Sequence, residues 1–278
     1  MSSTNKDRKT VEGFGDEWRR FDQSQLCVEE LREIFQKYFE IFPWHTLPEN
    51  AEGFDLGCGS GRWGRFVAQK VGTLHCIDAS DEALSVAKIN LRDRPNCLFH
   101  LASVSEMPLD DNSMDFGYSL GVLHHIPDTF SGIKDCASKL KVGAPFLMYL
   151  YYAFDNRPSW YRNLWRVSNI LRLAVSRSPR LLRYWITQLF ALFIYLPLSR
   201  SALLFEKLGI DVTVFPLSAY RHSSFYTMRT DALDRFGTRL EKRFTAEQIQ
   251  DMMEKAGLEN IVFSEKLFWC ALGYKSNA

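Results

Sequence analysis

The stretch FDLGCGSGRWG, residues 54–64, decides the fold. Its glycines Gly57, Gly59 and Gly61 alternate along the chain, and Asp55 stands two residues before the first of them. Glycines at this spacing let a backbone turn tightly and approach a nucleotide closely, typically between a strand and the following helix. The sequence therefore predicts a nucleotide-binding turn, and the surrounding residues must decide which nucleotide binds there.

Strand and helix patterns alternate around this turn. Apolar runs at residues 73–78, 97–102 and 144–152 predict strands, and segments with helical spacing separate them. This alternation is typical of a doubly wound, mostly parallel sheet in an α/β fold. Residues 260–266 and 267–275 predict two final strands with almost no loop between them, and strands joined so tightly must be antiparallel.

Two acids at strand ends distinguish between the candidate nucleotides. Asp55 puts a carboxylate near the place where a dinucleotide enzyme binds pyrophosphate, which a carboxylate would repel. A carboxylate suits an ammonium group, and S-adenosylmethionine carries an ammonium and no phosphate. Asp78 ends the next strand, where an acid can accept hydrogen bonds from both ribose hydroxyls. Because the glycines also satisfy GxGxxG, an NAD-dependent oxidoreductase is a weaker alternative.

Residues 53–152 resemble the class I S-adenosylmethionine-dependent methyltransferases, especially the group that acts on small molecules. FDLGCGSGRWG looks like that family's first motif, and CIDAS, residues 76–80, looks like its ribose-binding strand end. SEMPLDDNSMDFGYSLGVLHHIPD, residues 105–128, is similar to the stretch between its third and fourth strands. LKVGAPFLM, residues 140–148, stands where LKPGG usually introduces strand five. The resemblance implies a seven-stranded sheet whose last strand is antiparallel.

The resemblance also implies the cofactor site. Asp55 would hold the methionine ammonium and Asp78 the ribose, while Ser103 and Val104 would contact the adenine. Ser103 departs from the family, which often has an acid at this position, so the adenine amino group would meet a hydroxyl without charge. The predicted cofactor-binding residues are Asp55, Gly57, Cys58, Gly59, Gly61, Asp78, Ala79, Ser103, Val104 and Leu120.

His124 and His125 follow the fourth predicted strand, whose end lies beside the transferred methyl group in this fold. Either histidine could act as a general base or orient the substrate. The alternative is a structural role, because the dipeptide resembles a family feature that recurs whatever the substrate.

An arginine-rich insert follows the fifth strand. Residues 157–205 contain eight arginines and no Asp, Glu or Lys, with aromatic residues between them. Helical spacing predicts a lid over the strand ends. Three kinds of partner could balance its positive charge. The first is anionic lipid head groups, and the second is an anionic substrate. In the third, the arginines pair with acidic residues elsewhere while the apolar faces form a lid core or a dimer contact. The apolar stretch 184–198 is shorter than the roughly 20 residues of a spanning helix, and Pro197 interrupts it, so we predict no transmembrane helix.

The segment after this insert is rich in aromatic and hydrogen-bonding side chains. Such a segment beside an active-site rim favours a substrate-contacting role, and the alternative is a solvated connector with turn residues. The candidate substrate-binding residues are Tyr220, His222, Tyr226, Arg229 and Asp231.

Four regions follow from these patterns. Residues 1–50 form an N-terminal helical segment, which either packs on the sheet or covers the cofactor as a flap. Residues 51–152 form the cofactor-binding core, 153–243 the helical lid and substrate-facing insert, and 244–278 the last helix and two strands. The first ten residues are polar, so we expect a frayed tail and no signal peptide.

Composition limits the partners. The formal net charge of +1 and the lack of a separate basic domain argue against nucleic acid. Six cysteines and six histidines without ligand spacing predict no metal and favour a reducing, cytoplasmic setting. A peripheral contact with anionic membranes through residues 157–205 and a homo-oligomer both stay open.

The expected function is methyl transfer from S-adenosylmethionine to an O, N or S atom of a small molecule that is anionic or lipid-like. The alternative is a non-catalytic module that binds the cofactor or a partner on the same fold.

Overall fold

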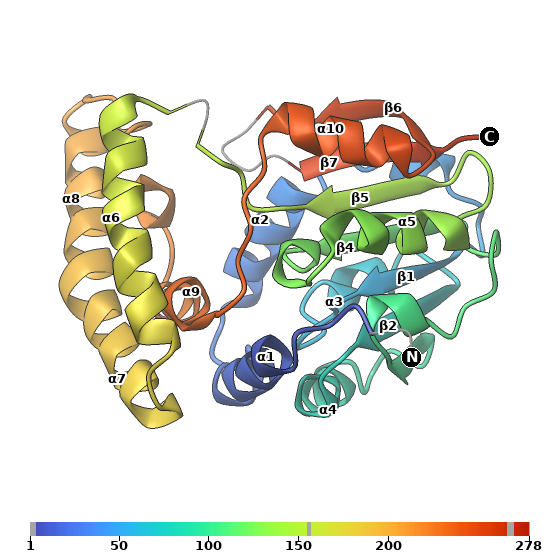
Figure 1. Cartoon of the computed structure of the whole chain (residues 1–278), viewed down its shortest axis with the longest axis horizontal. Helices are drawn as coiled ribbons and strands as arrows, with labels where there is room; N and C mark the ends of the chain where they lie inside the picture. The colour runs from blue at the N-terminus through green and yellow to red at the C-terminus, as the bar shows by residue number, and fades with distance from the viewer. Residues whose placement is uncertain (1–3, 155–156, 266–269, 278) are drawn as a thin grey trace. The chain divides into compact units, whose positions relative to one another are not determined.

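The computed structural model describes residues 4–154, 157–265 and 270–277, and the chain divides into two compact units (Figure 1). The first unit comprises Met1–Gln23, Leu31–Ala153 and Leu240–Ala278, and we call it the α/β unit. The second comprises Ser24–Glu30 and Phe154–Arg239, and we call it the helical unit.

A seven-stranded sheet forms the centre of the α/β unit, with strand order β3-β2-β1-β4-β5-β7-β6. The strands are β1 (Glu52–Leu56), β2 (Thr73–Asp78), β3 (Cys97–Leu101), β4 (Phe116–Leu120), β5 (Pro145–Tyr149), β6 (Leu258–Phe263) and β7 (Cys270–Lys275). Strands β1 to β5 pair in parallel, and β7 is antiparallel to both β5 and β6. The predicted α/β fold is therefore confirmed. Strand β6 begins two residues before the predicted start, and residues 267–269 of the last predicted strand lie outside the described residues.

Helices cover this sheet. They are α1 (Arg8–Arg20), most of α2 (Val28–Tyr38), α3 (Gly64–Val67), α4 (Asp81–Asn90), α5 (Thr129–Lys139) and α10 (Ala246–Lys255). On one face, a core that includes Phe54 and Phe146 packs against Ile133 of α5 and Ile249 of α10. Alternation along β1 therefore directs the next side chain, that of Asp55, to the other face of the sheet.

The N-terminal segment is more ordered than its polar sequence suggests. The side chain of Asp7 accepts a hydrogen bond from the Thr10 amide at 2.8 Å and caps α1. The Asn5 amide donates to Ser105 Oγ at 3.2 Å, and the Asn5 side chain donates to the Asp128 carbonyl at 2.7 Å. The predicted frayed tail is thus wrong from Asn5 onward, because these polar residues cap a helix and tie it to distant loops.

The helical unit consists of helices packed around α9. Its elements are α6 (Ser159–Ser176), α7 (Arg180–Phe190), the π-helical turn η4 (Ala191–Tyr195), α8 (Leu196–Lys207), η5 (Ser218–Tyr220) and α9 (Phe225–Gly237). Their core consists of Val175, Ala191, Tyr195, Met228, Ala232 and Phe236. Helix α9 lies in the segment for which a solvated connector was the alternative prediction, and its buried residues exclude that alternative.

One continuous helix runs from Arg180 to Lys207 through α7, η4 and α8. By length and composition alone this helix could cross a membrane, so the expectation that the apolar stretch is too short is wrong, and Pro197 does not end the helix. Proline lacks an amide hydrogen and disturbs a regular helix, but the π-helical turn directly before it changes the hydrogen-bond pattern and lets the helix continue.

A capping box begins α10. Thr245 Oγ1 accepts a hydrogen bond from the Gln248 amide at 3.2 Å, and Gln248 Oε1 accepts one from the Thr245 amide at 3.0 Å. We expect Thr245→Ala to destabilise the protein by about 1 kcal/mol, since one amide of the helix loses its partner. Thr245→Ser keeps the hydroxyl and is the control. Denaturant unfolding of the two variants checks this, and equal stabilities would contradict it.

Candidate functional site

The glycine turn between β1 and α3 has the geometry that its sequence predicts. Gly57 and Gly59 have φ angles of 75° and 55°, in the left-handed region that favours glycine. A Cβ atom added at Gly57 would lie 2.3 Å from Val122, and one added at Gly59 would lie 2.8 Å from the indole nitrogen of Trp18. The turn therefore requires glycine for its conformation and for the close approach of neighbouring side chains.

Asp78 lies at the end of β2, beside this turn. Its Oδ2 accepts a hydrogen bond from the Gly59 amide at 2.9 Å, and its Oδ1 accepts one from the Ser80 amide at 2.9 Å. Burial raises the pKa of Asp78, while the backbone amides of Ser80 and Gly59 oppose that shift. The carboxylate thus fixes the turn and is placed at the strand end where a ribose would bind.

Asp55 lies near the end of β1 and is 1% exposed. The Tyr118 hydroxyl donates a hydrogen bond to Asp55 Oδ2 at 3.0 Å. Burial raises the pKa of Asp55 to about 8, although this hydrogen bond lowers it. Sequence reasoning missed Tyr118. The pairing of β1 with β4 sets the two residues opposite each other, and only knowledge of the strand order would have revealed it.

The carboxyl ends of β1 to β4 bring the other predicted cofactor residues to one edge of the sheet. Ala79 directly follows β2, Leu120 ends β4, and Cys58 and Gly61 belong to the glycine turn. Leu120 and Cys58 are both buried. Because adjacent parallel strands end at the same edge, these residues are neighbours although they are distant in sequence.

The predicted adenine contact Ser103 has an acid beside it that the sequence interpretation did not use. Ser103 is buried after β3, and its hydroxyl donates a hydrogen bond to Glu106 Oε2 at 2.7 Å. Glu106 ends the 3₁₀ turn η2 (Val104–Glu106), so a carboxylate lies beside the place where the family often has an acid. Sequence reasoning missed Glu106, because it looked for the acid at Ser103 itself and not one helical turn later.

Helix α1 lies against the glycine turn and α4. A Cβ atom added at Gly15 would lie 2.6 Å from Ser80 Oγ, and Trp18 contacts Gly59. The Arg62 guanidinium lies 5.4 Å from the centre of the Trp18 ring. The N-terminal helix therefore contacts the predicted cofactor turn, as a flap would, while its role in binding stays a prediction.

His124 and His125 lie in the 3₁₀ turn η3 (Leu123–His125). The His124 ring is fully buried, with ring-centre distances of 3.9 Å to both His125 and Tyr151. Neither of its ring nitrogens has a hydrogen-bond partner among the residues that the structure describes. Burial lowers the pKa of His124 well below its usual value, and His125 and Arg243 lower it further. His124 is therefore a neutral imidazole in this environment.

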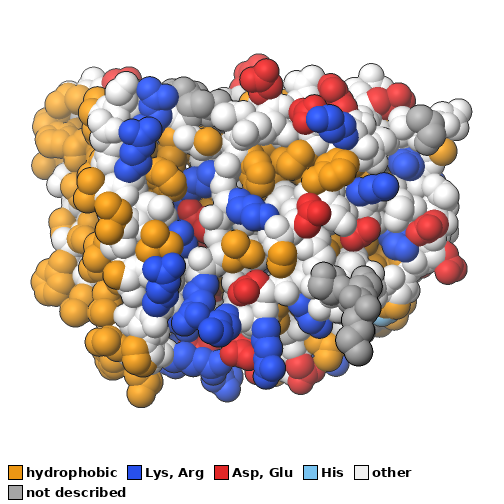
Figure 2. All heavy atoms as spheres, in the orientation of Figure 1, with side chains coloured by type: hydrophobic (Ala, Val, Ile, Leu, Met, Phe, Trp, Pro, Cys, Tyr) orange, Lys and Arg blue, Asp and Glu red, His pale blue; other side chains and the backbone are white. Residues whose placement is uncertain are grey.

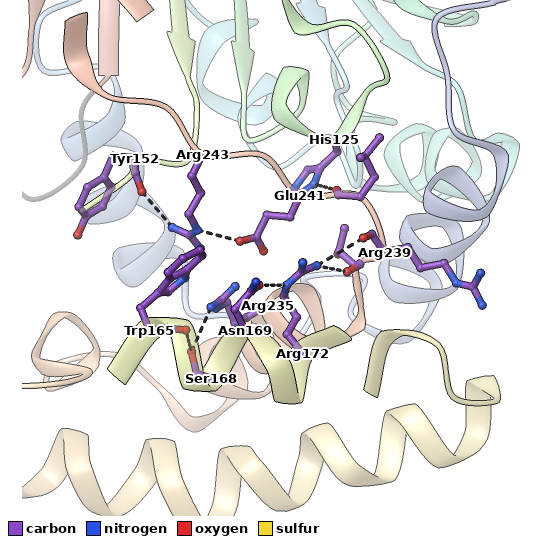
Figure 3. Close-up of polar contacts among 12 residues, drawn as sticks. His125, Tyr152, Trp165, Ser168, Asn169, Arg172, Arg235, Arg239, Glu241 and Arg243 are labelled. Carbon is purple, nitrogen blue, oxygen red and sulfur yellow. Dashed lines mark hydrogen bonds and ion pairs between the residues drawn. The ribbon is translucent and has the colours of Figure 1, made fainter. Parts of the chain in front are cut away.

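Residues 240–244 run beside these histidines. His125 Nδ1 lies 2.6 Å from the Leu240 carbonyl oxygen, which makes Nδ1 the donor (Figure 3). Arg243 donates to Glu241 Oε1 at 2.8 Å and to the Tyr152 carbonyl at 3.2 Å. Sequence reasoning missed Glu241 and Arg243, since no local motif marks them.

The candidate substrate residues lie in the helical unit, where several have partners. Arg229 donates to Gln188 Oε1 at 2.6 Å and to the Tyr184 hydroxyl at 3.1 Å. His222 Nε2 lies 3.0 Å from a Glu206 carboxylate oxygen. The Tyr220 ring packs at a tilted angle against the Tyr195 ring, with ring centres 5.4 Å apart, and both Tyr226 and Asp231 lie on α9. Their contact with a substrate stays a prediction.

Comparison with known proteins finds a methyltransferase domain in this chain. Residues 54–148 match a family described as a methyltransferase domain. The ubiquinone biosynthesis O-methyltransferase of Aliivibrio fischeri (strain MJ11) is 29% identical over 151 residues, which are 51% of this chain and 63% of that protein. The phosphoethanolamine N-methyltransferase 2 of Caenorhabditis elegans is 27% identical over 126 residues, 44% of this chain and 28% of that protein. The chain thus spans less than two thirds of these relatives' lengths.

Solved structures agree in fold. One is a chain of the complex between the Haloferax volcanii Trm112 methyltransferase activator and a protein assigned as a methyltransferase, with a TM-score of 0.57 and 14% identity over 97% of this chain and 98% of that one. Another is a possible histamine N-methyltransferase of Thermotoga maritima, with a TM-score of 0.51 and 15% identity over 95% of this chain and 100% of that one. These structures show the same fold for this chain, within which residues 54–148 match a methyltransferase domain.

Proposed function

We propose that this protein transfers the methyl group of S-adenosylmethionine to an O, N or S atom of a small molecule. The observation that carries the proposal is the pair of carboxylates, Asp55 and Asp78, at the ends of adjacent strands beside the glycine turn. Burial raises the pKa of both. An ammonium at Asp55 and ribose hydroxyls at Asp78 would supply the partners that compensate for this burial.

The reaction needs little from the protein beyond alignment. The sulfonium already activates the methyl group, so the protein's main tasks are to hold the acceptor atom in line with it and to exclude water. An acceptor that must lose a proton also needs a base. His124 is the candidate base, because neither of its ring nitrogens has a described partner and the neutral ring can accept a proton, while its lowered pKa makes it a weak base.

The acceptor atom follows from neither the fold nor the relatives, which include an O-methyltransferase and an N-methyltransferase. We infer an anionic or lipid-like acceptor, and the arginine-rich, apolar helical unit supports this. Incubating the protein with deuterium-methyl S-adenosylmethionine and cell extract, followed by mass spectrometry, identifies labelled products. Cofactor binding without any labelled product would favour the non-catalytic alternative.

Calorimetry on Asp55→Asn tests the cofactor assignment. We expect the variant to bind S-adenosylmethionine and S-adenosylhomocysteine roughly tenfold to a hundredfold more weakly, since both carry the ammonium and a charge-assisted hydrogen bond contributes about 1.5–3 kcal/mol. Wild-type affinity should rise with pH until Asp55 is ionised near its pKa of about 8. The variant should lack that rise. Weaker binding of S-adenosylmethionine alone would contradict the assignment and point to the sulfonium.

Asp55→Asn should weaken cofactor binding but raise the stability of the protein at high pH. A measured gain in stability would show that the variant is folded. The folded protein keeps the Asp55 proton up to about pH 8, whereas a carboxyl of ordinary pKa 3.8 releases it much earlier. The stabilisation present at low pH is therefore lost as the pH rises through this window. Asparagine cannot ionise, so we expect Asp55→Asn to unfold at a higher temperature than the wild type above pH 8.

A further inference from the structure

The helical unit exposes an extensive apolar surface. Figure 2 shows hydrophobic side chains gathered over α6, α7 and α8, flanked by basic side chains. Helical spacing of three or four residues puts these side chains on one face of each helix. We call this surface the apolar face. Its exposed residues are Trp160, Leu164, Val167, Ile170 and Leu171 on α6, and Leu181, Leu182, Trp185, Leu189, Leu192, Phe193, Ile194 and Leu204 on the helix from Arg180 to Lys207.

The apolar face is more hydrophobic than the solvent-exposed face of a helix in a soluble protein usually is. The helix Arg180–Lys207 is 28 residues long. Its most apolar stretch of 18 residues has a mean hydropathy of 1.5, and only 22% of that stretch is buried. Phe193 and Trp185 are 68% and 62% exposed. Monomeric soluble proteins rarely expose contiguous apolar patches of this kind, which mark contact with a membrane or another protein.

The opposite face of the same helix excludes a spanning orientation. Arg183 and Thr187 are buried there, and Arg183 Nη1 donates to the carbonyl oxygens of Ser176 at 3.3 Å and Gly237 at 3.1 Å. Crossing a bilayer would separate this face from α9 and expose an arginine to hydrocarbon, which is costly. The helix therefore fits an orientation in the plane of a membrane, with only the apolar face immersed.

Seven of the eight arginines of residues 157–205 fall into two groups, and Arg157 is half-buried. Arg172 and Arg183 are buried and donate to carbonyl oxygens, so they stabilise the helical unit from within. Figure 3 shows Arg172. Five others are exposed: Arg162, Arg166, Arg177, Arg180 and Arg200, of which Arg200 also donates to the carbonyl oxygens of Arg221 and Ser223. Exposed arginines beside an apolar face can bury their stems while their guanidinium groups reach lipid phosphates. The surface thus combines the two contacts that a peripheral membrane protein makes.

Charge favours a membrane over a second copy of the chain. In a two-fold symmetric dimer the same surface patch faces itself, so its arginines would meet one another. Residues 157–205 contain no acid that could pair with them. Like charges across an interface are unfavourable, whereas anionic head groups complement them. We propose that the apolar face of the helical unit inserts into one leaflet of an anionic phospholipid bilayer, with the exposed arginines at its head groups. The proposal concerns this surface alone and is independent of the methyl acceptor.

Co-sedimentation of the full chain with vesicles tests the proposal. The vesicles contain phosphatidylcholine alone or phosphatidylcholine with phosphatidylglycerol. We expect the wild type to sediment with the anionic vesicles at low salt, and salt should weaken but not abolish binding, because it screens charges over about 10 Å at 0.1 M but leaves apolar insertion intact. Protein that stays in the supernatant on anionic vesicles at low salt would overturn the proposal.

Two pairs of variants separate the contributions. Phe193→Glu should lower the vesicle partition coefficient at least about tenfold, because a carboxylate is unfavourable in the apolar layer. Ile89→Glu is the matched control, since Ile89 is 61% exposed on α4, and it should bind as the wild type does. Arg177→Gln with Arg180→Gln should remove the preference for anionic vesicles, whereas Lys88→Gln with Arg92→Gln should not. Equal losses in Phe193→Glu and Ile89→Glu would contradict the proposal.

Light scattering without lipid tests the competing explanation, in which the apolar face forms a dimer. A wild-type dimer that Phe193→Glu converts to a monomer, together with no vesicle binding, would assign the apolar face to a second copy of the chain. Unchanged affinity for S-adenosylhomocysteine in all variants shows that the α/β unit is folded, and an unchanged helical circular dichroism signal shows the same for the helical unit that carries the substitutions.

Discussion

His124→Phe is expected to lower kcat about 10²–10⁴-fold with an acceptor that must lose a proton, the usual contribution of a general base. Phenylalanine keeps a ring between His125 and Tyr151 but lacks the two buried ring nitrogens, which have no hydrogen-bond partner among the described residues. Because a buried polar atom without a partner is destabilising, the variant should be at least as stable as the wild type. Initial rates with the acceptor found by mass spectrometry, and thermal unfolding, measure both effects.

Lost activity with retained stability excludes a purely structural role, and a loss confined to acceptors that must lose a proton distinguishes a base from a residue that only orients the substrate. A purely structural histidine would give the reverse, a destabilised protein whose remaining folded fraction is fully active. Calorimetry with S-adenosylhomocysteine is the control, since the substitution should leave cofactor affinity unchanged. If kcat with a proton-losing acceptor stays within a factor of two or so of the wild type, His124 is not the base.

Asp78→Ala is expected to weaken cofactor binding by a few kcal/mol. A charge-assisted hydrogen bond contributes about 1.5–3 kcal/mol, and two bonds to neighbouring ribose hydroxyls are not additive. The structure adds a second cause, because Asp78 also holds the Gly59 and Ser80 amides. Losing these bonds should loosen the glycine turn as well. Calorimetric titration with S-adenosylhomocysteine measures the loss.

Asp78→Asn separates the two causes. Asparagine keeps one oxygen acceptor but has no charge, so it can hold one of the two amides while binding the ribose less strongly. We expect an intermediate affinity and a thermal stability closer to that of the wild type than Asp78→Ala has. Full affinity in a folded Asp78→Ala protein would remove Asp78 from the site.

The sequence alone determined the features that depend on neighbours along the chain. The alternation of apolar strands with helices predicted the sheet, because burial of one strand imposes a local apolar pattern. The glycine turn was equally visible, since residues with positive φ must be glycine where side chains approach closely. The positions of Asp55 and Asp78 could also be predicted from the local sequence. Each lies at or beside a strand end, and the strand end is marked by the end of the apolar run.

Only the tertiary structure decided which distant residues meet. Strand order sets Tyr118 opposite Asp55, and a helical turn brings Glu106 to Ser103. Packing around α9 made a core helix from a segment that the sequence predicted to contact the substrate, with a solvated connector as the alternative. It also buried Arg172 and Arg183 while leaving an apolar face exposed. The sequence presented these arginines as one group, because the local sequence does not show which side of a helix will be covered by another helix. Buried and exposed arginines could therefore not be separated. Which side is covered depends on contacts between residues far apart in the chain, and only the folded protein fixes them.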